Sequence, residues 1–533
     1  MDAILQQLLA FPPHPPPANP PSDAEYDKQI NIQIQHLNHI PASKLTAPVP
    51  GGGDLLDVID PSVNTISYLY VLLAQINSPS GKQKAGSTSD SYAPVSLLWL
   101  KTLEFMERFD HIQIRYVGNE FRRLVEMTAA NARLVSQVSS YSIKQRTVID
   151  KVQPFAAIPA IRSAILRVDP SGATFTSSHL IFVRLCLEAR VYYDALPVLD
   201  QNIYYFPTST NKAAQNNRFP YFCSDHESSS TFITPESGLS AKLVYRDHLQ
   251  YFLYGAMIYM GLKDWKHALF FLEVVISSPV ANNASKIQVE AYKKWVLVRL
   301  LYKGHPVLTA FLKPLAVPKT TNSQALKQYR ALAKAYDALA EIFHVGIKEG
   351  HDKQRLIEEA QVGMQFWDSD CNRGLVRQVL EAFRKFSILQ LQSTFAALTV
   401  ADITRKTSPD PSDYAGTGRY VVNLISSGQL NATISEPSDD PKSWIIRFSD
   451  PTSGPLARSE EQQHDALVKQ TRKVEDLVRH IRELDRKLSL TKDYIGDAKK
   501  KKKEQNGEGG EAGSAWTTHG EGFDHDEDMM ADL

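Results

Sequence analysis

The sequence has very little cysteine. Cys186, Cys223 and Cys371 are the only three in 533 residues, and they stand far apart. A disulfide framework or a thiolate metal site needs cysteines in pairs or close groups. The count therefore argues against both and favours a reducing compartment.

An excess of either charge and a long apolar run are also missing. Lysine and arginine together number 59, as do aspartate and glutamate, so no net charge favours nucleic acid or a membrane surface. No stretch reaches the roughly 18 uninterrupted apolar residues of a membrane-spanning helix. The N-terminus, MDAILQQLLAFPPHPPP, lacks the basic start and the apolar length of a signal peptide. We expect a soluble, intracellular protein with no membrane partner.

Catalytic motifs are absent as well. The sequence contains no His-Glu-x-x-His, and no His-x-His followed by the aspartate of a metalloprotease site. The glycine run at 51–53 lacks the Gly-Lys-Ser/Thr of a phosphate-binding loop. We therefore expect no enzyme activity, no catalytic or metal-binding residue, no cofactor and no small-molecule substrate.

What the sequence does have is a long helical array, clearest in residues 251–300. Apolar residues there recur at helical spacing on both sides of a polar turn at 262–264, and Pro279 ends the second helix. An aromatic-x-x-Ala-Leu-x-x-Leu pattern at 265–272 recurs 73 residues upstream, at 192–199. This favours tetratricopeptide-like repeats, which bury their apolar faces by stacking, over an ordinary buried helical core.

The helical character covers residues 96–395, which we interpret as a solenoid. Residues 207–235, rich in Ser, Thr and Asn, are predicted to loop out of it. Residues 1–95 mix short helical pieces with Pro/Gly linkers. Helices are predicted at 66–76, 95–138 (one or two), 154–167, 178–199, 291–301, 325–343, 353–366 and 374–395.

The pattern changes in residues 396–450. A short helix is predicted to begin after Thr399, a suitable N-cap, and a second helix at 420–427. Two alternating runs, 430–434 and 444–448, then indicate a β-hairpin. Helix, helix, strand, strand at the end of a helical array is the order of a winged-helix module.

The last predicted element is an amphipathic helix at 458–492. Six apolar residues, which we term the seam, follow a 3.5-residue period for about three heptads, as in a coiled coil or a helical bundle. Residues 493–533, with a basic run at 499–503 and an acidic one at 524–532, are disordered by composition. The seam consists of Leu467, Val474, Leu477, Ile481, Leu484 and Leu488.

The predicted winged helix has few of the residues that a DNA-binding winged helix uses. Its second predicted helix has only Arg419 beside it and Asn423 as a base-reading side chain, whereas a groove-binding helix brings several cations to phosphates. The basic run at 499–503 fits a nuclear-import signal or an acidic partner as well as it fits a solvated surface. Nucleic-acid binding is not favoured.

The order of helical repeats, winged helix and terminal helix resembles the PCI family, the scaffold subunits of the proteasome lid, the COP-nine signalosome and eukaryotic initiation factor three. Within it, the similarity is to one signalosome subunit and spans roughly residues 160–490. Residues 1–95, 207–235 and the tail depart from it. The similar stretches are at 185–187, 195–200, 254–263, 268–269, 290–295 and 372–378.

The resemblance implies a non-catalytic scaffold of the complex that removes Nedd8 from cullins through a metalloprotease in another subunit, and so regulates cullin-RING ubiquitin ligases. It implies other PCI subunits as partners and a location in nucleus and cytoplasm. The seam would join a helical bundle, and the 444–448 strand with its mate would present unpaired backbone to a neighbour. A proteasome-lid subunit and a nucleic-acid-binding PCI protein of mRNA export remain as alternatives. The strand residues concerned are Trp444, Ile445, Ile446, Arg447 and Phe448.

Overall fold

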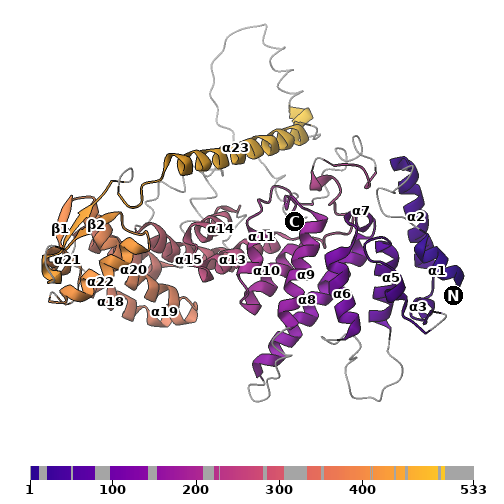
Figure 1. The fold of residues 1–533 in the computed structure, drawn as a ribbon, viewed down its shortest axis with the longest axis horizontal. Coiled ribbons are helices and arrows are strands. Elements are labelled where there is room, and N and C mark those ends of the chain that lie inside the picture. The colour runs from indigo at the N-terminus through magenta and orange to yellow at the C-terminus, as the bar shows by residue number, and fades with distance from the viewer. Residues whose placement is uncertain are drawn as a thin grey trace, which may run out of the picture. The chain divides into compact units, whose positions relative to one another are not determined.

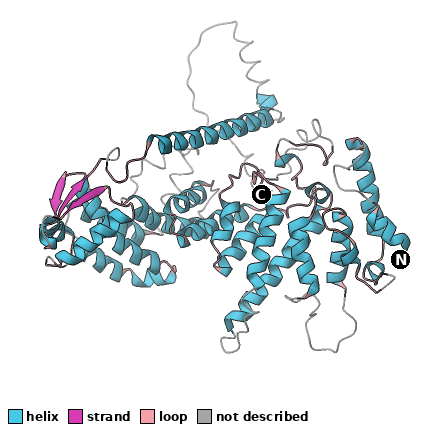
Figure 2. Cartoon of the chain, in the orientation of Figure 1, coloured by secondary structure: helices cyan, strands magenta, loops and turns pink. Residues whose placement is uncertain are grey.

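The structure is a computed structural model of the chain, and it is mostly helical (Figures 1 and 2). The described residues fall into two compact units, one within 1–258 and 480–533 and the other within 259–479. The predicted features at 499–503 and 524–532 lie outside the described residues. The structure describes residues 2–10, 21–49, 52–78, 96–141, 153–207, 221–226, 228–279, 285–304, 333–349, 353–408, 410, 412–436, 440–450, 454–489 and 494–497.

The first unit is an array of helices. Helices α8, α9 and α10 pack on one another, and α5 packs on α6 and α8. The α5 helix is buried on nearly all sides, as its continuous apolar sequence predicts. The elements are α1 (Asp2–Leu9), α2 (Asp23–His39), α3 (Ala42–Leu45), α4 (Leu55–Val58), α5 (Thr65–Asn77), α6 (Leu97–Arg108), α7 (His111–Ile114), α8 (Gly118–Tyr141), α9 (Gln153–Val168), α10 (Ser177–Ala189), the 3-10 turn η3 (Tyr193–Ala195), α11 (Leu196–Leu199), the 3-10 turn η5 (Ser229–Thr231) and α13 (Tyr245–Gly261).

The central helix–turn–helix is confirmed. The α13 helix ends at Gly261, and α14 (Trp265–Ser277) begins after Asp264, whose carboxylate accepts a hydrogen bond from the backbone N–H of His267 at 3.2 Å. The upstream copy of the pattern is different. There α10 ends at Arg190, which has a left-handed φ of 59°, and residues 193–199 form only two short turns. The copy shares the buried alanine and leucine but not the helix length.

The prediction that residues 207–235 loop out of the solenoid is wrong for their described part. The segment is irregular as expected, but Cys223, Phe232 and Ile233 are buried. Arg115 of the turn after α7 donates a hydrogen bond to the carbonyl of Phe222 at 2.8 Å and stacks its guanidinium 4.0 Å from the Phe232 ring centroid. The small polar side chains of this segment form hydrogen bonds with backbone groups inside the unit rather than with water.

The second unit is also mostly helical and contains a small sheet. In it α15 packs on α14, α17 and α20, and Gly363 divides the helix predicted at 353–366 into two. The elements are α14, α15 (Lys286–Lys303), α17 (Lys334–Glu349), α18 (Lys353–Val362), α19 (Met364–Ser369), α20 (Arg373–Gln392), β1 (Ala397–Thr399), α21 (Val400–Thr407), α22 (Tyr414–Ser426), β2 (Ala432–Ser435), the 3-10 turn η6 (Pro441–Ser443), β3 (Ile445–Phe448) and the first part of α23 (Glu460–Ser489).

The winged-helix module is confirmed, with one more strand than predicted. Thr399 caps α21, its side chain accepting the N–H of Asp402 at 3.2 Å. The added strand β1 pairs antiparallel with β3, and β2 pairs with the other side of β3 (Figure 2). Side chains from α20, α21, α22 and both hairpin strands form its core: Ile388, Val400, Ile403, Val421, Leu424, Leu430, Ala432 and Ile446.

The α22 helix begins at Tyr414, earlier than the predicted 420–427. Two glycines in its first turns resemble a loop in sequence, but Asp413 caps the helix by accepting the N–H of Gly416 at 2.8 Å. Gly418 is placed where a Cβ would lie 3.2 Å from the Trp444 ring. Close contact between α22 and the hairpin therefore explains a glycine that looks unfavourable for a helix.

Candidate assembly surfaces

The α23 helix carries an apolar face that is open to solvent. It is 30 residues long, and Ser459 and Gln462 form a reciprocal cap at its start, with hydrogen bonds of 3.2 and 3.3 Å. At about 1.5 Å per residue the helix spans about 45 Å. The six seam side chains keep between 42% and 61% of their surface exposed. Large apolar side chains exposed along one stripe are typical of an interaction surface.

Sequence reasoning missed one member of this face. Val478 follows Leu477 directly and is 38% exposed. It takes the position after d in the heptad, so it widens the stripe on one side. A seam broadened in this way is typical of a helix that contacts more than one neighbour in a bundle.

The last part of α23, from His480 on, belongs to the first unit and contacts it through a different face. Glu483 accepts a hydrogen bond from the Tyr205 hydroxyl at 2.6 Å, and the His480 ring lies edge-on to Tyr204 at 3.9 Å between centroids. Neither residue belongs to the seam. At 100° per residue they project from the flank of the helix, so the seam stays uncovered.

The sheet presents a free edge, but not at the predicted strand. Because β3 is the central strand, its backbone is paired on both sides, and the expectation that 444–448 offers unpaired backbone is wrong. Ile446 is fully buried in the module core, and Arg447 is exposed on the other face. The mate of this strand, β2, lies at the edge of the sheet, as does β1.

The outward groups of β2 follow from its register. Asn431 accepts a hydrogen bond from the Ser449 N–H at 2.9 Å, so the backbone of Thr433, two residues on, also points to β3. The backbone N–H groups of Ala432 and Ile434 therefore point away from the sheet. Within the described residues neither N–H has a hydrogen-bond partner, so together they form an edge that a neighbouring strand can pair with.

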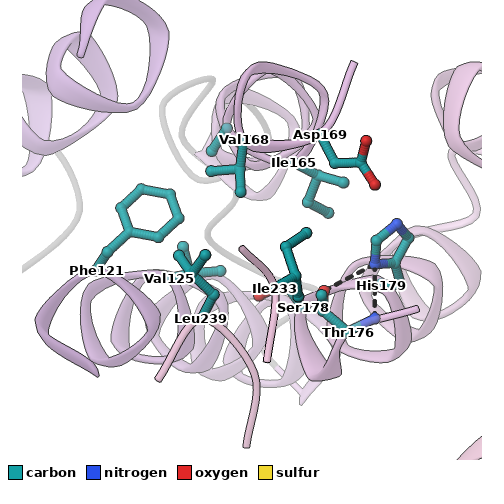
Figure 3. A pocket seen from close by; sticks show the side chains of 11 residues that line it. Phe121, Val125, Ile165, Val168, Asp169, Thr176, Ser178, His179, Ile233 and Leu239 are labelled. Carbon is teal, nitrogen blue, oxygen red and sulfur yellow. Dashed lines mark hydrogen bonds between the residues drawn. The ribbon is translucent and has the colours of Figure 1, made fainter. Parts of the chain in front are cut away.

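One small cavity in the first unit is lined mainly by apolar side chains. It lies between α8, α9, α10 and the segment 233–239, and Figure 3 shows apolar side chains around it with His179 at one side. It has room for about one water molecule. His179 is fully buried, and its Nδ1 accepts the N–H of Thr176 at 3.2 Å, closing the cap of α10. Burial lowers the pKa of His179 to about 4, so the ring is neutral at physiological pH.

Three further properties of the described residues bear on chemistry. Nowhere among them do three or more His, Cys, Asp or Glu side chains come together as a metal would require. Of the helices in these ranges, none has the length and apolar content to cross a bilayer. The thiol of Cys186 is buried, and burial raises its pKa to about 12, which makes it unreactive.

Known proteins resemble this chain over its whole length. The family model described as COP9 signalosome complex subunit 3, N-terminal helical repeats, matches residues 43–224 and 229–315. A COP9 signalosome complex subunit 3 from Emericella nidulans is 36% identical over 533 residues, all of both chains. One from Neurospora crassa is 24% identical over 94% of this chain and 92% of its own. Another, from Dictyostelium discoideum, is 26% identical over 71% and 78%. The resemblance thus extends into residues 1–95, which the sequence analysis had left out.

Proposed function

The chain belongs to the family of COP9 signalosome complex subunit 3, and on that premise we propose that it is a non-catalytic scaffold subunit of a signalosome. In this proposal the helical repeats set the shape of the subunit, and α23 and the winged helix hold it to sister PCI subunits in nucleus and cytoplasm. The removal of Nedd8 from cullins, and through it the regulation of cullin-RING ligases, is performed by another subunit of the complex.

The observation that carries the proposal is the uncovered seam of α23. Its side chains remain about half exposed in the chain by itself, although they are large and apolar. Burying about 300 Å² of apolar surface at about 25 cal/mol per Å² contributes about 7 kcal/mol before the costs of association. A bundle of helices from sister subunits would supply that burial.

A charge in the seam tests this directly. We expect Ile481→Asp to weaken docking by about 2 kcal/mol or more, which is about a thirtyfold loss of affinity, because the carboxylate must be desolvated in the bundle. The measurement is recovery of the other subunits with the tagged chain from cell extract. Circular dichroism and thermal unfolding of the purified variant establish that its own fold is intact.

Arg472→Asp is the matched control. It places the same carboxylate on the same helix, on the side opposite the seam, and is expected to recover the complex as wild type does. Full recovery with Ile481→Asp as well would remove the bundle assignment.

The two alternatives have their own tests. Mass spectrometry of the purified assembly distinguishes a signalosome from a proteasome lid. For nucleic acid, α22 contains Arg419 as its sole basic residue, which does not favour groove binding. A gel shift that stays blank at low salt would eliminate that alternative.

A further inference from the structure

A buried polar network in the second unit connects α15, α17 and the turn that starts α20. Lys294 of α15 donates a hydrogen bond to Asn372 Oδ1 at 2.9 Å, and Asn372 Nδ2 donates to the Tyr336 hydroxyl at 2.8 Å. The hydroxyl in turn donates to Asp370 at 2.8 Å, and Lys293 pairs with both oxygens of that carboxylate at 2.8 Å.

The centre of the network is closed to water and directional, whereas the side chains of Lys293 and Asp370 are 17% and 18% exposed. Lys294 is 6% exposed, and Tyr336 and Asn372 are each 1% exposed. The amide of Asn372 accepts from one partner and donates to the other, so neither a carboxylate nor an apolar side chain can replace it. Glu290, one turn before Lys294, pairs with the same ammonium. Both lysines and Asn372 lie in the stretches that carry the family resemblance.

Burial of a lysine is not a source of stability by itself. Moving an ammonium out of water costs several kcal/mol, and apolar replacements of buried ion pairs are often neutral or stabilising. What a directional network supplies is a single arrangement, because any slide or rotation of the helices breaks several hydrogen bonds together.

The position of the network indicates what it arranges. Asn372 is the N-cap residue of α20, and α20 is shared by the helical array and the core of the winged helix. Further along, Phe386 packs on Gly304 at the end of α15, where a Cβ would come within 2.2 Å of its ring. Phe343 of α17 also packs on Phe383 and Phe386, so apolar contacts hold the middle of α20. The polar network adds a directional contact at its N-terminus.

The far half of α20 transmits that direction to the module. Arg384 donates a hydrogen bond to the Thr417 hydroxyl of α22 at 2.7 Å, and its guanidinium lies 4.8 Å from the Tyr420 ring centroid. The first turn of α20 is therefore connected, through the rest of this helix, to α22 and the sheet of the winged-helix module.

We propose that the Lys294–Asn372–Tyr336–Asp370–Lys293 network is an orientation lock. It fixes the winged-helix module in one direction relative to the last helical repeat, and so aims the free edge of the sheet at its neighbour. The lock is a property of the chain alone; its use in assembly rests on the proposed function.

Distance measurement in the full-length chain tests the lock. Spin labels are attached at Tyr302→Cys on α15 and Arg405→Cys on α21, both exposed, in a Cys371→Ser background, since Cys186 and Cys223 are buried. The reference chain is expected to give one narrow distance distribution. The double variant Lys294→Met/Asn372→Leu is expected to fold, and to widen the distribution at least about twofold, since the apolar pair has no direction.

Melting temperatures measured together with the distances distinguish an orientation lock from a network that only contributes packing. Asn372→Leu alone leaves the buried ammonium without one acceptor and is expected to lower the melting temperature by about 5 °C. Adding Lys294→Met is expected to recover most of that loss without narrowing the distances. The control Lys286→Met/Gln378→Leu replaces a lysine and a side-chain amide outside the network, and is expected to match the reference in both measurements.

Two results would overturn the lock, and a third would overturn its use in assembly. An unchanged distance distribution in Lys294→Met/Asn372→Leu overturns the lock, and so does a narrow distribution restored together with stability. Wide distances with full recovery of sister subunits overturn its use in assembly. The proposed function would still stand in that case, because Ile481→Asp tests it independently.

Discussion

The side chain of His179 shows how burial connects one residue to the pH dependence of the whole unit. Its folded pKa of about 4 lies below the ordinary 6.5 of histidine because the ring is desolvated between α9 and α10 (Figure 3). The unfolded chain therefore binds a proton that the folded chain does not. The stabilising contribution is complete above pH 6.5 and is lost as the pH falls towards 4.

This predicts a measurable cost in mild acid. At pH 5 the loss from His179 is about 2 kcal/mol relative to pH 7. His179→Gln removes the titration but keeps the cap, since glutamine at this position can accept the Thr176 N–H as the third residue of a capping box. Urea unfolding at the two pH values should show a drop in stability about 2 kcal/mol smaller in the variant. An equal drop in both chains would mean that His179 is not the group that titrates.

Among the elements, β2 is where the structure changes the sequence-based expectation most. Both hairpin strands have the alternating pattern of a half-buried strand, and nothing in either run reveals which lies at the edge. That depends on β1, a strand of three residues at 397–399 that the analysis of periodicity did not detect. Such a strand is too short for an alternation signal, and it forms because β3 offers it a partner.

The edge can be tested at Ile434, whose N–H points away from β3. Ile434→Pro removes that donor without removing a hydrogen bond inside the sheet, so the fold should persist while strand addition by a neighbour is blocked. Ile434→Ala shortens the same side chain and keeps the N–H. We expect the proline variant to lose the neighbouring PCI subunit from purified complexes and the alanine variant to retain it. Equal retention by both would show that this edge does not pair.

Other elements were predictable because one local signal dominated. The apolar run at 66–76 gives α5, and the polar turn at 262–264 separates α13 from α14. The helix predicted at 178–199 is shorter than expected, because Arg190 adopts a left-handed conformation that ends α10, and Pro197 follows. Segment 221–235 was predicted wrongly because its small polar residues look solvated. In the structure the Ser229 hydroxyl shares a hydrogen bond with the Thr174 hydroxyl, and the backbone carbonyl of Phe222 accepts one from Arg115.

For the whole molecule, the seam was the part of the candidate site that sequence alone could predict. Heptad spacing shows which side of the helix is apolar, but it does not show whether the same chain covers that side. The structure leaves it uncovered, with contacts at Glu483 and His480 on the flank. The polar lock lay beyond prediction, because residues 77 and 78 positions apart meet only in the folded unit.

An uncovered seam predicts the behaviour of the purified chain without its sister subunits. The isolated protein should self-associate as its concentration rises, since copies of the stripe can bury one another. Ile481→Asp together with Leu484→Asp should keep it monomeric. Sedimentation velocity over a wide concentration range measures this. A wild-type chain that stays a single monomeric species throughout would contradict the expectation.

The central position of β3 also bears on how many companions the sheet can take. Because β3 has one strand on each side, the sheet has two different edges, a short one at β1 and a longer one at β2. The two edges differ in length and sequence, so they are not interchangeable. Modules joined edge to edge in this way would form a row with a defined polarity. The two edges of each module would then determine the position of its subunit in the row.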